Sequence, residues 1–125
     1  GRLYLNRSRW RVGRQMPRGP LPWPVEEVKH DKGAALSESW GTLAGASGGA
    51  MGINLAWLMG AARIVLHGFE MKPGHYHADH KVGTPEHLYR DVFIPSFERM
   101  AEALRGRCEV VNATPGSALT CFPQG

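Results

Sequence analysis

Residues 45–80 read GASGGAMGINLAWLMGAARIVLHGFEMKPGHYHADH and contain four successive features of an α/β unit. A glycine-rich turn comes first, and an apolar helix, an apolar strand and a histidine-rich loop follow it. Open α/β sheets bind ligands at the carboxyl ends of their strands. We therefore expect the turn and the loop to lie on the same edge of one layer, where a functional site would form.

The helix and the strand in this stretch are both expected to be buried. Ser47 can cap a helix over residues 49–60, which is apolar nearly all round, and such helices are usually buried. The residues expected on one buried face are Met51, Leu55, Leu58 and Met59. The strand over residues 63–69 is almost continuously apolar, as are parallel strands covered on both faces.

The second half of the chain continues the alternation of helices and strands. Thr84 and Pro85 are typical of a helix start, and Pro95 interrupts the helical spacing of apolar residues that follows. The elements expected from this pattern are helices over residues 85–93 and 95–105 and a strand over residues 108–112. Such alternation predicts a parallel sheet. We therefore expect an α/β fold with a Rossmann-like parallel sheet, small or truncated, in three layers.

Residues 1–44 are expected to form a basic, proline-rich arm and connector that precedes a core over residues 45–125. One or two short strands are predicted over residues 3–12. The segment 16–24 holds four prolines and one glycine, which predicts an extended connector. The segment 25–44 has no clear periodicity, because glycines and serines interrupt it.

The positive charge of the chain is concentrated near its N-terminus. Residues 1–32 hold eight Lys or Arg and three Asp or Glu, a net charge of +5, whereas the remaining residues carry −1. A basic segment of this kind can attract nucleic acid. A solvated arm or a face packed against a partner chain is the alternative interpretation.

Composition places the chain among soluble, cytoplasmic-type proteins. Its apolar runs are too short to span a membrane, and no apolar region follows the N-terminal arginines as it would in a signal peptide. The two cysteines, Cys108 and Cys121, are too few for a disulfide scaffold and favour a reduced compartment, although one disulfide between them is left open. Because the chain begins with Gly1, we expect a processed product or a fragment.

Three groups of polar or small residues could bind a ligand at the expected edge. Backbone N–H groups around Ser47, Gly48 and Gly49 could hold phosphate at a helix N-terminus, although tight packing could also require small residues there. Glu70 follows the strand and could bind a ribose hydroxyl or lie at the surface. The loop after the next strand contributes Asn112 and Thr114, which could bind the ligand or simply form a turn.

The histidine-rich loop has the pattern HxHxDH. The residues that could ligate a metal such as zinc are His75, His77, Asp79 and His80. The same pattern occurs in the metallo-β-lactamase fold, but that fold needs further ligands downstream, where this chain has only His87. The histidines could instead contact a ligand, act as acid or base, or be solvated.

The runs ASGGAMGINLAWLMGAARIVLHGFEMKPGHYHADH (46–80) and EVVNATPGSALTCFP (109–123) resemble a group of phage-encoded proteins of unassigned role. The same core resembles the MptE-like diphosphokinase family and, more distantly, bacterial sialyltransferases that use CMP-sialic acid. The resemblance implies a Rossmann-like domain with the nucleotide near the glycine turn, and an acidic residue at position 70. It also implies that Tyr76, His77 and His80 assist the leaving phosphate. Nothing in residues 1–44 resembles the first strand and nucleotide loop of such folds.

Three functions follow from these features. The first is a nucleotide- or nucleotide-sugar-binding transferase-like domain, with His77 or His80 as general acid or base. The second is a metal-dependent hydrolase that uses the HxHxDH loop. The third is a non-catalytic nucleic-acid or assembly protein of a phage. For each of the three we expect a cytoplasmic protein, in the host cytoplasm if a phage encodes it, that can form a homo-oligomer.

Overall fold

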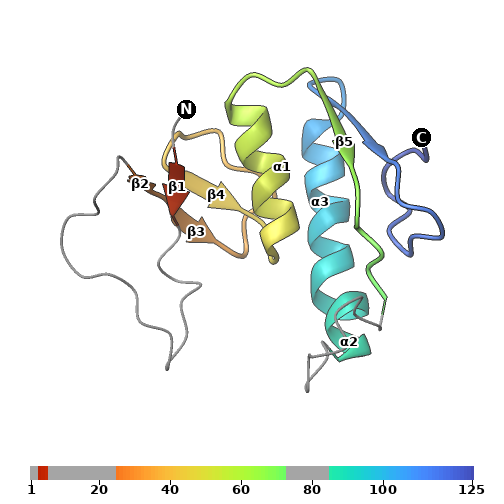
Figure 1. Ribbon diagram of the computed structural model, residues 1–125. Coiled ribbons are helices and arrows are strands. Elements are labelled where there is room, and N and C mark those ends of the chain that lie inside the picture. Colours follow the sequence, from red (N-terminus) through yellow and green to blue (C-terminus); the bar gives the residue numbers. More distant parts are fainter. Residues whose placement is uncertain (1–2, 6–24, 73–84) are drawn as a thin grey trace.

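The computed structural model describes residues 3–5, 25–72 and 85–125 (Figure 1). The expected strands beyond Leu5, the proline-rich connector and the histidine-rich loop lie outside the described residues. The elements in chain order are β1 (Leu3–Leu5), β2 (Val25–Glu27), β3 (Lys29–Asp31), β4 (Thr42–Ala44), α1 (Gly48–Leu58), β5 (Arg63–Leu66), α2 (Glu86–Leu88), the π-helix η2 (Tyr89–Phe93), α3 (Ile94–Leu104) and β6 (Glu109–Asn112). No helix in the described part is long and apolar enough to cross a membrane.

The described strands form three parallel pairs, β1–β2, β3–β4 and β5–β6. The β5–β6 pair runs from Arg63 opposite Glu109 to Leu66 opposite Asn112, and the helical segment from α2 to α3 connects its strands. This is the parallel crossover that the alternation predicted, so the α/β class is confirmed. The strands β2, β3 and β4 were not expected, because glycines and serines interrupt the segment 25–44 and each strand has only three residues.

The helices α1 and α3 lie side by side against the β5–β6 pair (Figure 1). Ile53 of α1 and Phe97 of α3 are buried in one cluster with Leu66 of β5 and Val110 of β6. Further buried members of this cluster are Ala44, Ala50, Met100, Leu104, Leu119 and Phe122. The main core therefore lies between the two helices and one face of the sheet.

The three-layer Rossmann arrangement is wrong for the described part of the chain. The outer face of the β5–β6 pair carries Arg63 and Glu109, which face each other in register and form an exposed ion pair of 3.2 Å. Val65, on the same face, is 44% exposed. The apolar run predicted burial on both faces of β5, but the strand has only four residues. Its outer face carries Arg63 and then Val65, so a single apolar side chain lies on that face.

Helix α1 is apolar on opposite sides because it separates two cores. Ala50 and Ile53 belong to the main core, whereas Met51 packs with Val28 and Leu43 beneath the β3–β4 pair. The structure thus confirms the helix predicted over 49–60, which spans Gly48–Leu58, and it confirms that apolar residues on more than one side of this helix are buried. Met59 differs from the prediction, because it forms the C-cap and is 62% exposed.

Pro95 does not break the helix that contains it. The chain stays helical from Glu86 to Leu104, with a π-helical turn at Tyr89–Phe93 immediately before the proline. The N–H of Ile94 bonds to the carbonyl of Tyr89, five residues back. Proline lacks an N–H and its ring clashes with the carbonyl four residues earlier in an α-helix, and a wider turn relieves both problems.

A buried asparagine joins α1 to the strands before it. Oδ1 of Asn54 accepts the N–H groups of Ser37 and Ala44, each at 2.9 Å, and its Nδ2 donates to the carbonyl of Ser37 at 2.9 Å. Asn54 is fully buried. Its side chain therefore supplies the partners that three backbone groups need inside the protein.

We expect Asn54→Leu to lower the free energy of unfolding by about 3 kcal/mol or more, because each buried polar group left without a partner costs about 1–3 kcal/mol. Urea denaturation followed by circular dichroism measures the change. Met59→Ala, at an exposed position of the same helix end, is the control and should stay within about 0.5 kcal/mol of the original protein. Equal stability of the two variants would contradict the role given to Asn54.

Candidate functional site

The carboxyl ends of the parallel strands β5 and β6 lie at one edge of their pair, and α1 begins on the same side (Figure 1). The ring of Phe69, in the loop after β5, lies next to Gly49 of α1. The loops after these strands are bonded to each other. The N–H of Phe69 donates to Oγ1 of Thr114 at 2.9 Å, and the N–H of Ala118 donates to the carbonyl of Glu70 at 2.8 Å. Nζ of Lys72 also reaches the carbonyl of Gly116 at 2.9 Å. This edge is therefore the place where the described candidate residues converge.

The turn before α1 is held from two sides. The N–H of Gly45 donates to the carbonyl of Asp31 in β3 at 3.2 Å, and the N–H of Ala46 donates to Oγ of Ser96 in α3 at 2.9 Å. Gly45 has φ +113°, and a Cβ there would lie 2.4 Å from the Cβ of Ala50. Glycine is required at this position by both conformation and space.

Ser47 is the N-cap of α1, as predicted. Its Oγ accepts the N–H of Ala50 at 3.3 Å, and its carbonyl accepts the N–H of Met51. The N–H groups of Gly48 and Gly49 find no acceptor among the described residues. Gly48 is exposed, so a ligand from solvent can reach this helix end. Two free N–H groups and the positive end of the helix dipole are the features that bind anions.

Gly49 has a packing role as well. A Cβ at this position would lie 2.7 Å from the ring of Phe69 and 3.4 Å from the ring of Phe97. These two rings meet edge to face with their centroids 5.8 Å apart. The interpretation that small residues serve tight packing therefore applies to Gly49.

The strand predicted over residues 63–69 ends at Leu66, so Glu70 lies in the loop after β5, four residues beyond the strand, and its side chain is exposed. The backbone carbonyl of Glu70 is bonded to the neighbouring loop, whereas its carboxylate has no ion pair within the described segments. The next residue, Met71, has φ +52°, the left-handed conformation that a residue with a side chain seldom adopts. The side chain of Glu70 is thus held on a fixed backbone and remains available.

Asn112 and Thr114 are buried, and their hydrogen bonds are internal. Nδ2 of Asn112 donates to Oγ of Ser117 at 3.0 Å and to the carbonyl of Leu119 at 3.1 Å, and Oδ1 accepts the N–H of Thr114 at 3.0 Å. Oγ1 of Thr114 accepts from Phe69, as described above. Turn formation, the alternative that the sequence left open, accounts for both residues.

The remaining predicted site residues lie outside the described residues, namely His75, Tyr76, His77, Asp79 and His80. The described segments contain no group of three or more His, Cys, Asp or Glu side chains that could hold a metal ion. The metal site and the catalytic roles of the histidine loop therefore stay predictions.

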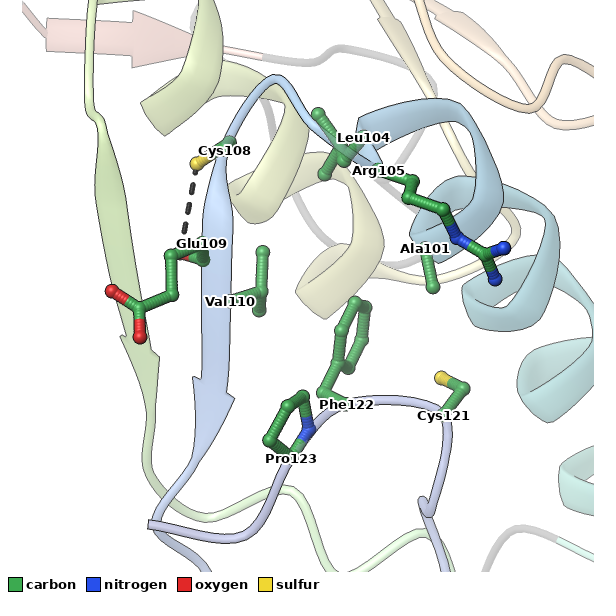
Figure 2. A pocket seen from close by; sticks show the side chains of 9 residues that line it. All are labelled: Ala101, Leu104, Arg105, Cys108, Glu109, Val110, Cys121, Phe122 and Pro123. Carbon is green, nitrogen blue, oxygen red and sulfur yellow. Dashed lines mark hydrogen bonds between the residues drawn. The ribbon is translucent and has the colours of Figure 1, made fainter.

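A pocket of about 290 Å³ lies away from this edge, between the end of α3, the start of β6 and the C-terminal segment (Figure 2). Cys108 and Cys121 line opposite parts of it and are both free thiols. Burial raises the pKa of Cys108, and burial raises the pKa of Cys121 to about 11. Both sulfurs are thus protonated at neutral pH and are poor nucleophiles.

Comparison of the chain with protein-family models, with curated proteins and with solved structures found no match.

Alanine substitutions of Gly49 and Gly52 in α1 distinguish the effect of packing on stability from the effect of helix propensity. Gly49→Ala should destabilise the protein by about 1 kcal/mol or more, because the methyl group would press on the ring of Phe69. Gly52→Ala should stabilise it by about 0.5–1 kcal/mol, because position 52 is helical and open. Thermal unfolding of both variants tests this, and a shift of the same sign in both would contradict it.

The two thiols should react slowly with iodoacetamide at about pH 8 in the folded protein and rapidly in urea. Because the thiol of Cys121 titrates at its ordinary 9.0 when unfolded and near 11 when folded, the unfolded state loses its proton first. The free energy of unfolding should therefore fall as the pH rises above about 9. Cys121→Ser should reduce that fall, and an identical pH dependence in the variant would contradict the assignment.

Proposed function

We propose that this protein binds a phosphate-bearing ligand of the nucleotide or nucleotide-sugar class at the start of α1, and that it is a transferase-like domain. The observation that carries the proposal is the pair of N–H groups of Gly48 and Gly49, which have no acceptor among the described residues. They lie at the positive end of an eleven-residue helix. An anionic oxygen placed there would gain two hydrogen bonds and a favourable dipole interaction.

The surroundings support a ligand larger than phosphate. Glu70 presents an exposed carboxylate in the loop after β5, and the ring of its neighbour Phe69 lies next to Gly49 at the start of α1. A carboxylate in this position can accept hydrogen bonds from the hydroxyl groups of a ribose. The resemblance to the diphosphokinase and sialyltransferase cores supports the same ligand class. Transfer from the bound nucleotide would then use His77 or His80, which remain predicted acid–base residues, and Tyr76, for which the resemblance implies a supporting role.

The ring of Phe69 limits where the phosphate can lie. Because this ring occupies the space next to Gly49, the ligand would approach from the exposed side of Gly48. Asn112 and Thr114 would support the loops without contacting the ligand. The metal-dependent hydrolase rests on the HxHxDH loop over residues 75–80, and the nucleic-acid-binding protein rests on the basic segment over residues 1–32. No contact among the described residues favours either function.

Gly48→Asp tests the phosphate position. A carboxylate at the helix start would compete for the N–H groups and repel an anion, so the Kd for nucleoside diphosphates should rise at least about tenfold, or about 1.4 kcal/mol. The same change should raise thermal stability, because a negative charge at a helix N-terminus contributes about 0.3–1 kcal/mol. A loss of binding in this variant could not then be attributed to unfolding.

Gly52→Asp is the matched control, since it adds the same charge at an exposed position one turn later in α1. Isothermal titration calorimetry with nucleoside mono- and diphosphates and a CMP-sugar would measure the Kd of each ligand for the original protein, for Gly48→Asp and for Gly52→Asp. Absence of nucleotide binding to the original protein, or an equal loss in both variants, would contradict the proposal.

Glu70→Ala tests the ribose contact separately. The Kd for a nucleoside diphosphate should rise about tenfold, as expected for loss of a hydrogen bond to a charged group. The Kd for inorganic pyrophosphate, which has no ribose, should stay the same or fall because a nearby negative charge is removed. An equal rise in the Kd of the nucleoside diphosphate and of pyrophosphate would show that Glu70 does not contact the sugar.

A further inference from the structure

We draw no further inference here: the strongest candidate, the outer face of the β5–β6 pair with the exposed Val65, which no described helix covers, carries a single exposed apolar side chain beside an ion pair, and nothing in the described residues shows what covers it.

Discussion

The hydrogen bonds of the Asn54 carboxamide are the contact on which the position of α1 against the segment from Ser37 to Ala44 depends. It binds the backbone of Ser37 and of Ala44, which belong to the loop after β3 and to β4. Met51 of α1 also packs against Val28 and Leu43, but apolar packing by itself does not fix the position of one element along another. A buried, fully engaged amide fixes that position, because any displacement leaves backbone groups without partners. The register of β4 against α1 therefore follows from this one side chain.

The position of the glycine-rich turn depends on these hydrogen bonds of Asn54. The turn begins directly after β4, where His30 of β3 donates from Nε2 to the carbonyl of Gly45. On its other side, Ser96 holds the N–H of Ala46 and so ties the turn to α3. Ser96 is buried one residue after Pro95, so the π-helical turn that accommodates the proline also bears on where the hydroxyl lies. Two distant parts of the chain thus determine where the free N–H groups of α1 point.

Long elements with a clear period could be predicted from the sequence, and short or side-chain-specified ones could not. Helix α1, strand β5, the helix around Phe97 and the parallel strand β6 follow from apolar spacing and capping residues. The strands β2 to β4 are three residues each, and β2 pairs with β1 whereas β3 pairs with β4. Their partners lie at a distance in the sequence, which no local pattern records. Asn54 reads as one polar residue in an apolar helix, and its role depends on groups seventeen and ten positions away. The apolar run of β5 indicated burial on both faces because the sequence does not show that Arg63 meets Glu109 across the strand pair.

In the candidate site, too, some properties of single residues could be predicted from the sequence and others depend on contacts that only the structure shows. A glycine, an asparagine and a threonine near a strand end indicate ligand binding and turn formation equally well, because both need small or polar residues there. The contacts in the structure distinguish ligand binding from turn formation. Gly45 and Gly49 leave no room for a Cβ, and Asn112 uses both of its amide hydrogens within the loop, so structure alone accounts for them. Gly48 and Glu70 have no such explanation among the described residues. The described contacts of Gly49, Asn112 and Thr114 thus serve the fold, whereas the exposed start of α1 at Gly48 and the carboxylate of Glu70 are left without such a role among the described residues.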